Sequence, residues 1–384
     1  MKALALVDAP DHVCCRYRLR AFEPALRAAG WTLTPQALAR RAFGRLAQFA
    51  RAADFDIVIL QRKLLPRWQF ALLRRSARRL AFDFDDAVLY RDSYDPRGPH
   101  SRRRLGRFGQ TVRGADTVIA GNDFLADCAL RAGARPERVQ VIPTCIETTR
   151  YQPNPRPEGA TGLELVWIGS SSTLQGLEQQ RALWERVGRE VPGVRLRVIC
   201  DRFPSFDGLP VVAVPWSEAT EAADLAAGDV GISWVPDDLW SRGKCGLKVL
   251  QYQAAGLPVI ANPVGVHPEM IEPGASGFLP KTDDDWVDAV RALAIDPSLR
   301  ARLRTAARAS VDAYYSVAAW SSAFVTALAE PGSRIPSPRS RPFGHARPPG
   351  RPGRRPHLGM KRASLPFAHD SSDQKHKHWE GRAE

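Results

Sequence analysis

The chain has 384 residues, a length that fits two domains of ordinary size. With 44% hydrophobic and 25% charged residues, it has the composition of a globular protein. The net charge of +14 is concentrated at one end, because residues 331–384 hold 12 Lys or Arg against 4 Asp or Glu. The remaining residues are only mildly basic, so the charge does not predict a nucleic-acid-binding protein, and no nucleic-acid partner is expected.

The six cysteines form no CxxC pair and have no histidine at the spacing of zinc ligands. That pattern is typical of reduced thiols in a cytoplasmic protein. Residues 1–8 become charged too early for a signal peptide and indicate a first strand. No run approaches the roughly 18 apolar residues that a membrane-spanning helix needs, which excludes an integral membrane protein.

Short apolar runs alternate with helical patterns in two series. The first series predicts strands at residues 3–7, 57–60, 80–84, 117–120 and 139–142. The second predicts strands at residues 163–168, 195–199, 211–214, 230–234 and 259–261. The expected helices include residues 22–29, 68–76, 122–132, 177–190, 247–255 and a last one near 316–328. Because the strands are apolar on both faces, this α/β alternation predicts parallel sheets covered by helices.

A stretch rich in Pro and Gly, residues 151–160, separates the two series and marks a domain boundary. We therefore expect a Rossmann-like domain at 1–150 and a second one at 151–330 that includes the closing helix, with a cleft between them. Residues 331–384 contain nine prolines and few large apolar groups, so a disordered basic tail is expected there.

Residues 240–261, WSRGKCGLKVLQYQAAGLPVIA, are the richest in chemistry. A helix that begins near residues 241–244 would place Lys244, Lys248 and Gln251 on one face. Its positive N-terminus, with Arg242 close by, would suit an anion such as a diphosphate. The alternative is a surface helix with solvated lysines.

The segment AAGLPVIA at 254–261, followed by VGVHPEMIEPGASGFL at 264–279, resembles the donor-binding signature of glycosyltransferase family 4, also called group 1. The resemblance implies the GT-B fold and transfer of a sugar from a nucleotide sugar to a glycan, lipid-linked or small-molecule acceptor. It also implies retention of configuration, with no metal and no cofactor beyond the donor. In the family the loop after the strand contacts the donor sugar, which implies this part for Val266, His267 and Glu269.

Two departures from the family pattern concern its Glu-x7-Glu pair. Gln251 stands at the second position and can still bind a ribose hydroxyl, but Gly243 at the first position supplies no carboxylate. The form WSRGKxxxKxLxY resembles a subgroup without the pair. A catalytically silent protein that binds a nucleotide sugar or a partner stays open as an alternative. A sugar-nucleotide epimerase would need a histidine and an acid in the cleft, and only three histidines precede the tail.

Other candidates lie where strands are expected to end. The backbone N–H groups of Gly169, Ser170 and Ser171 could meet phosphate oxygens, unless they form a plain turn between strand and helix. One of Asp83, Asp85 and Asp86 could hold an acceptor hydroxyl or support an oxocarbenium-like centre. Asp85 or Asp86 could instead cap a helix, and the paired acids could bind magnesium.

Three further residues are candidates on the acceptor side. Arg16 and Arg18 follow the first strand and could hold an anionic acceptor, or they could be solvated at the start of a helix. Asn122 reads first as a helix N-cap and second as a ligand contact.

A basic, amphipathic segment at 67–80, together with Arg102–Arg104, could rest on an anionic membrane surface. The alternative is a helix packed on the sheet with solvated arginines.

Overall fold

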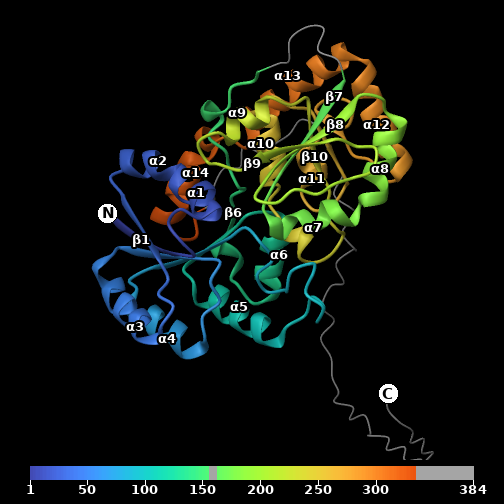
Figure 1. The fold of residues 1–384 in the computed structure, drawn as a ribbon. Helices are drawn as coiled ribbons and strands as arrows, with labels where there is room; N and C mark the ends of the chain where they lie inside the picture. The colour runs from blue at the N-terminus through green and yellow to red at the C-terminus, as the bar shows by residue number, and fades with distance from the viewer. Residues whose placement is uncertain (155–161, 334–384) are drawn as a thin grey trace, which may run out of the picture. The chain divides into compact units, whose positions relative to one another are not determined.

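The computed structural model describes residues 1–154 and 162–333. In those residues two six-stranded sheets, with all neighbouring strands parallel, carry helices on both faces (Figure 1). The α/β class and the parallel sheets expected from the sequence are therefore confirmed.

The first sheet has the strand order β2-β1-β3-β4-β5-β6. Its strands are β1 (Lys2–Val7), β2 (Thr32–Ala37), β3 (Ile57–Gln61), β4 (Leu80–Phe84), β5 (Thr117–Ala120) and β6 (Val139–Val141). The three central strands β3, β4 and β5 are buried along their whole length, which is why their apolar runs could be recognised. The sequence missed β2, an edge strand that contains Pro35, since an edge tolerates a residue without an N–H.

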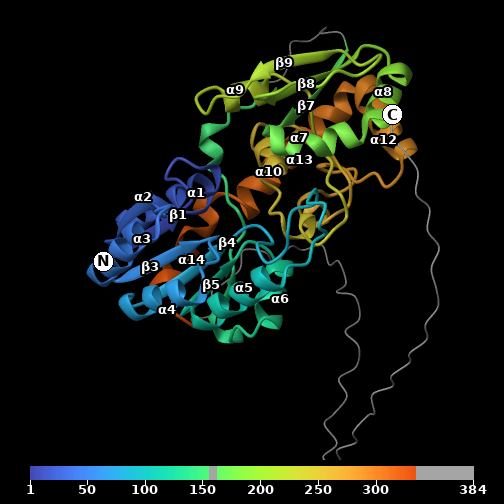
Figure 2. The ribbon, with the colours of Figure 1, turned by 60° about the horizontal axis from the view of Figure 1, so that its bottom comes forward.

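Helices cover both faces of this sheet, and one of them comes from the far end of the chain. One face carries α3 (Ala42–Ala50), α4 (Arg67–Ser76), α5 (Arg102–Gly114) and α6 (Asp123–Arg131). The other carries α1 (Val13–Arg18), α2 (Glu23–Ala28) and α14 (Val317–Ala329). Figures 1 and 2 show α14 against the first sheet, and the rings of Phe22 and Phe324 stack there at 4.3 Å. The closing helix expected in the second domain thus packs on the first.

The second sheet has the order β12-β11-β10-β7-β8-β9, the arrangement of a dinucleotide-binding sheet. Its strands are β7 (Leu163–Ile168), β8 (Val194–Cys200), β9 (Val211–Pro215), β10 (Val230–Ser233), β11 (Val259–Ala261) and β12 (Gly277–Phe278). One face carries α7 (Ser171–Gln179), α8 (Arg181–Glu190) and α12 (Asp283–Ile295). The other carries α9 (Glu221–Ala226), α10 (Leu247–Ala254) and α13 (Pro297–Tyr314), and the short α11 (His267–Met270) follows β11. The single helix expected at 177–190 is two helices, α7 and α8.

Five 3-10 turns complete the described elements: η1 (Arg20–Phe22), η2 (Arg51–Asp54), η3 (Pro136–Arg138), η4 (Thr148–Arg150) and η5 (Ser241–Gly243).

The chain leaves the first sheet after β6 and returns before α14, and the two crossings lie side by side. Ile146 N–H donates to Tyr315 O at 2.9 Å, and Val317 N–H donates to Ile146 O at 3.0 Å. The Pro- and Gly-rich boundary begins at this crossing, although residues 155–161 lie outside the described part of the chain.

The expected tail also lies outside the described residues from position 334 onward. Among the residues that are described, no helix combines the length and the apolar character needed to span a bilayer. In both sheets the strand order reverses in the middle, beside β1 and β3 in the first and beside β7 and β10 in the second. Ligands of open α/β sheets bind at the carboxyl ends of strands at such points, so a ligand site is expected there.

Candidate functional site

The carboxyl ends of β3 and β4 bring one arginine and two aspartates together. Asp85 and Asp86 follow β4, and Arg62 follows the neighbouring β3. The Arg62 guanidinium lies 3.5 Å from Asp85 and is still closer to Asp86. Arg62 has a φ of 59°, a left-handed backbone that costs a non-glycine residue on the order of 1 kcal/mol, and the ion pairs offset this cost. No helix begins at the aspartates, so the expected alternative of a helix cap is wrong; α5, the next helix, is capped by Ser101.

Asp86 has an unusual acidity. Burial raises the pKa of this carboxyl to about 6, because the loss of hydration outweighs the favourable charges of Arg62 and Lys244. A carboxyl with a pKa of this kind can take up and release a proton near neutral pH. Because Lys244 acts on Asp86, residues from the first and the second domain lie at one site.

Lys244 and Lys248 lie near each other, but the backbone that joins them differs from the expected continuous helix. The helix does not start at 241–244: η5 ends at Gly243, Lys244 is extended, and α10 begins only after Gly246, whose φ is 65°. A Cβ at Gly246 would lie 2.5 Å from the sulfur of Met270, so glycine is required for both its backbone and its size. The prediction that Lys244 shares a helix face with Lys248 is therefore wrong.

The two ammonium groups nevertheless act on each other. The Lys248 side chain is half-buried, and its Nζ lies 5.2 Å from the centre of the Trp167 ring. Loss of hydration, reinforced by the charge of Lys244, lowers the pKa of Lys248 to about 7. Among the described residues neither lysine has a carboxylate partner at ion-pair distance. The site is therefore electropositive and suited to an anion.

Gly243 is fixed by close packing between the two domains. A Cβ at this position would lie 2.6 Å from the Cβ and 2.8 Å from the backbone N of Ala87. Asn122 caps α6 through its Oδ1, as expected, and its Nδ2 donates to the carbonyl oxygens of Gly243 and Lys244, each at 3.2 Å. The place of the family's first glutamate is thus filled by the first domain and has no room for a carboxylate.

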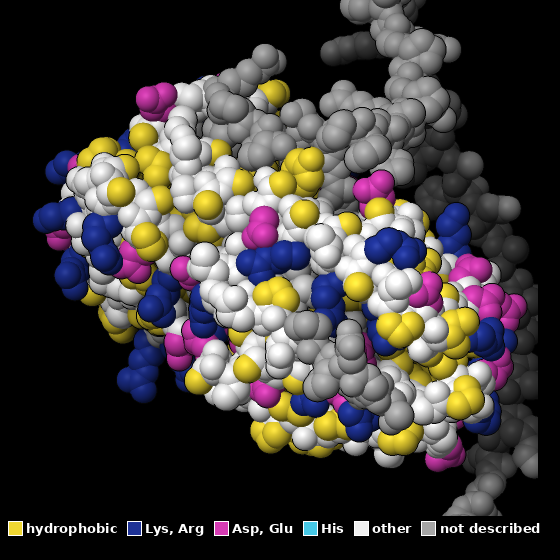
Figure 3. Space-filling view, turned by 90° about the horizontal axis from the view of Figure 1, so that it is seen from above, with side chains coloured by type: hydrophobic (Ala, Val, Ile, Leu, Met, Phe, Trp, Pro, Cys, Tyr) yellow, Lys and Arg dark blue, Asp and Glu magenta, His cyan; other side chains and the backbone are white. Residues whose placement is uncertain are grey.

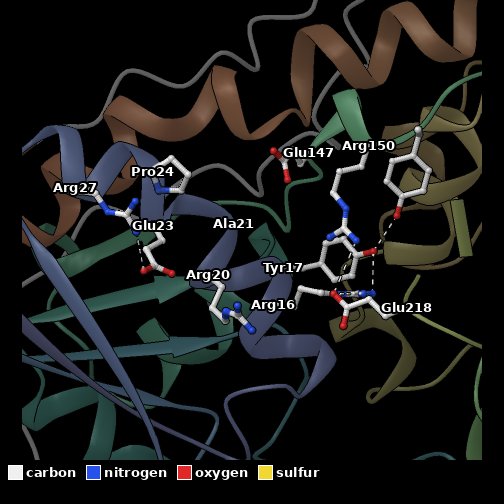
Figure 4. A pocket seen from close by; sticks show the side chains of 11 residues that line it. Arg16, Tyr17, Arg20, Ala21, Glu23, Pro24, Arg27, Glu147, Arg150 and Glu218 are labelled. Carbon is white, nitrogen blue, oxygen red and sulfur yellow. Dashed lines mark hydrogen bonds and ion pairs between the residues drawn. The ribbon is translucent and has the colours of Figure 1, made fainter. Parts of the chain in front are cut away.

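Gln251 belongs to a buried polar network around Glu221. Its Nε2 donates to the hydroxyl of Tyr17 at 3.2 Å, and that hydroxyl lies 3.0 Å from Glu221. Arg16 pairs with the same carboxylate at 2.9 Å. It also pairs with Glu218 at 3.0 Å (Figure 4). The geometry therefore gives Arg16 and Gln251 a part in joining α1 to α9 and α10. It offers no support for Arg16 as an acceptor contact or for Gln251 as a ribose contact.

Arg18 is engaged in the interior of the first domain. Its side chain is 1% exposed and pairs with the fully buried Asp83 at 2.5 Å, and its Nη1 donates to Ile142 O at 2.7 Å. Removal of one partner of such a pair leaves an uncompensated buried charge, so the pair holds α1 on the sheet. The expected role of Arg18 in holding an acceptor has no support in this geometry.

The turn after β7 differs from the expected phosphate loop. The N–H of Gly169 donates to Ile199 O at 3.1 Å, that of Ser170 to the hydroxyl of Thr173 at 3.2 Å, and that of Ser171 to Asp201 at 2.8 Å. All three donors have acceptors within the chain. The geometry therefore matches the alternative, a plain turn between strand and helix, with Ser170 as the N-cap of α7.

The remaining donor-side candidates surround a cavity of about 310 Å³. Its lining includes Asn122 from the first domain and Arg242, Val266 and the exposed Glu269 from the second. Arg242 pairs with Asp237 at 2.8 Å at the rim.

His267 lies beside this cavity but is buried. Its Nδ1 donates to Asn262 O at 2.8 Å, and its Nε2 lies 3.4 Å from the hydroxyl of Ser233. Burial lowers the pKa of His267 to about 4, so the ring is neutral at physiological pH. A neutral ring in this arrangement orients polar groups and carries no charge to an anion.

Sequence reasoning missed Arg62 and Trp167. Arg62 belongs to no motif, yet it stands at the end of an apolar strand, the signal that identified Asp85 and Asp86. The Trp167 ring lies close to both Gly169 and Lys248. Trp167 and Lys248 are about 80 positions apart in the sequence, so only the fold reveals that they lie close together.

Comparisons with solved structures show which fold the chain has. Sucrose-phosphate synthase from Thermosynechococcus elongatus superposes with a TM-score of 0.65 at 15% identity, over 86% of this chain and 98% of that one. Anabaena HepE in complex with UDP-glucose gives 0.62 at 14% identity, over 86% and 99%. The fold is GT-B. Residues 240–310, which contain both lysines, match the family of glycosyl transferases group 1.

Sequence relatives match part of the GT-B chain. The D-inositol 3-phosphate glycosyltransferase of Saccharomonospora viridis is 29% identical over 238 residues, 55% of this chain and 54% of the relative. The enzyme of the same name from Actinosynnema mirum is 29% identical over 239 residues, 54% and 56% of the two chains. The chain thus matches about half the length of these relatives. The comparisons thus show the GT-B fold and a similarity of residues 240–310 to glycosyl transferases of group 1.

Proposed function

We propose that the protein is a glycosyltransferase that moves a sugar from a nucleotide sugar to a hydroxyl group of a glycan, a lipid-linked or a small-molecule acceptor. The observation that carries the proposal is the pair Lys244 and Lys248, unpaired among the described residues and facing Asp86. The silent alternative, a GT-B protein that binds a nucleotide sugar without reaction, shares the lysines but needs no carboxyl of raised pKa.

The lysines are proposed to bind the diphosphate. When the bond between the sugar's anomeric carbon and the phosphate oxygen breaks, the electron pair stays on the leaving nucleoside diphosphate. Two ammonium groups already in place stabilise that charge without reorganisation. We propose that they supply the positive charge that a divalent cation would otherwise provide, so that the reaction needs no metal and no cofactor.

The first sheet is proposed to hold the sugar and the acceptor hydroxyl. Asp86, kept in position by Arg62, is proposed to accept a hydrogen bond from that hydroxyl and to oppose the positive charge that develops on the sugar. With retention of configuration, the new bond forms on the face that the diphosphate leaves. The hydroxyl proton then passes to a leaving phosphate oxygen. Glu269, exposed at the donor-side cavity, is proposed to contact the sugar from the other domain.

The test is a screen of UDP-, GDP-, ADP- and dTDP-sugars with the purified full chain, in which release of free nucleoside diphosphate is measured with and without EDTA. We expect release from at least one donor, unaffected by EDTA. Lys248→Met should abolish it, whereas Lys281→Met should not, because Lys281 is exposed on the same domain and away from the site. Measurable donor binding without release from any donor would favour the silent alternative. The anomeric configuration of a product, read by NMR, tests retention.

A further inference from the structure

Three neighbouring helices of the first domain expose large apolar side chains on one surface. The helices α3, α4 and α5 lie side by side on one face of the sheet (Figures 1 and 2). Their buried residues, such as Phe49, Phe70 and Phe108, point to the strands. The same helices also expose Phe43 (86%), Trp68 (52%), Leu105 (52%), Leu72 and Leu46 to solvent. We name these five residues the apolar ridge.

The same three helices are strongly and uniformly basic. Their sequences, AFGRLAQFA, RWQFALLRRS and RRRLGRFGQTVRG, contain nine arginines and no Asp or Glu. The exposed Arg67, Arg75, Arg102 and Arg103 make no ion pair within the described residues. Loss of hydration and the charges of Arg103 and Arg45 together lower the pKa of Arg107. Arg74 pairs with Asp116 at 3.2 Å, but most arginines of these helices make no ion pair within the described residues, and such a surface attracts anions.

We infer that this surface docks the protein on an anionic lipid bilayer, with the apolar ridge inserted among the lipid headgroups. Positive charge of this density complements the negative charge of such a membrane. Exposed Trp and Phe next to arginines are the combination that interfacial binding requires. The face seen in Figure 3 contrasts with it, since basic and acidic side chains are mixed there. The inference does not depend on the proposed reaction, although a lipid-linked acceptor would give it a purpose.

The apolar ridge favours a bilayer over a nucleic acid. Phosphate backbones are bound by cationic and hydrogen-bonding groups, and an aliphatic side chain gains little from them. Transfer of the Phe43 and Trp68 rings from water to an apolar medium is favourable, and a bilayer can accept both rings together with the aliphatic side chains of the ridge. Lipid binding therefore has to depend on the ridge as well as on the arginines.

The experiment measures co-sedimentation of the full chain with vesicles. Vesicles of equal parts phosphatidylglycerol and phosphatidylcholine are compared with pure phosphatidylcholine. The apolar variant is Phe43→Ser/Trp68→Ser, and its matched control is Phe203→Ser/Ile295→Ser, two exposed apolar residues of the second domain. The charge variant is Arg102→Gln/Arg103→Gln, and its matched control is Arg189→Gln/Arg302→Gln. All variants keep residues 334–384, so the basic tail contributes equally to each.

We expect the wild type to bind to the anionic vesicles only. The apolar variant and the charge variant should each bind at least about tenfold more weakly, and both controls should bind like the wild type. Equal binding of the apolar variant and the wild type would overturn the inference, as would equal binding to pure phosphatidylcholine. An oligonucleotide that binds the wild type and the apolar variant equally, but not the charge variant, with no vesicle binding, would assign the surface to nucleic acid instead. Thermal unfolding of each variant verifies that it is folded.

Discussion

Replacement of Lys248 by methionine separates binding from stability more sharply than any other change. Methionine keeps the length and apolar stem of the side chain but removes the charge. In the protein without donor, the ammonium is held in a place where it has lost hydration and faces Lys244. The charge is therefore unfavourable for folding and favourable only when an anion is bound. We expect Lys248→Met to make the protein more stable and less active at once.

The size of the stability effect follows from the pKa. The decrease from 10.5 to about 7 corresponds to roughly 5 kcal/mol, at about 1.36 kcal/mol per unit. Because the side chain is only half-buried, water screens much of this energy, and the lost contact with Trp167 removes about 0.5–1 kcal/mol more. We expect a net stabilisation of about 1 kcal/mol, which raises Tm by roughly 2–4 °C.

The stabilisation by Lys248→Met should depend on pH. Below pH 7 the folded protein must carry the desolvated ammonium, so the wild type bears the full penalty there. As the pH rises from about 7 towards 10.5, the folded state releases the proton while the unfolded state keeps it, and the penalty falls. The Tm difference between Lys248→Met and the wild type should therefore be larger at pH 6 than at pH 9.

The assay pairs thermal unfolding at these two pH values with release of nucleoside diphosphate at pH 7. Turnover should fall about 100-fold or more, the usual loss when one preorganised stabiliser of a developing negative charge is removed. A variant that is less stable than the wild type, or one that is stabilised but retains full turnover, would refute the reasoning.

Three further predictions concern the same site. Asp86→Asn should lower turnover about 10- to 100-fold and should remove the rise in rate that the wild type shows near pH 6. A pH–rate profile measures this, and the surface change Asp127→Asn should leave the turnover and the profile unchanged. Gly243→Ala should cost about 1–3 kcal/mol in chemical denaturation, because its Cβ would meet backbone atoms of the first domain. Gly106→Ala, in open space on α5, should instead stabilise by about 0.5–1 kcal/mol, and equal effects of the two changes would contradict the packing argument. Binding of a nucleoside diphosphate should be accompanied by uptake of about half a proton at pH 7, because the anion raises the pKa of Lys248. Calorimetry in two buffers of different ionisation enthalpy measures this uptake. Binding without proton uptake would contradict a contact between the diphosphate and Lys248.

The fold could be predicted largely because its central strands are buried on both faces. The runs 80–84, 117–120 and 163–168 correspond to β4, β5 and β7 at both ends. The edge strand β2 escaped because Pro35 and its polar residues lack that signal. The start of α10 was misplaced because the helix begins at a left-handed glycine, and Gly246 gives no cue for this in the sequence.

The site could be predicted only in part, since partners distant in sequence decide what each charged residue does. Arg16 and Arg18 look alike in the sequence, yet both are engaged in buried ion pairs with Glu221 and Asp83. Gly243 was read as a missing acid, and only its contact with Ala87 shows that packing requires glycine there. Lys248 was found through a motif, but its lowered pKa depends on burial, which no spacing conveys.

The most direct test of the central claim is calorimetric titration of the protein with UDP, GDP, ADP and dTDP. At least one should bind to the wild type and to Lys281→Met with the same Kd, and at least about tenfold more weakly to Lys248→Met, which loses a charge-assisted contact. An unchanged Kd in Lys248→Met would contradict the assignment of the diphosphate to the lysine pair.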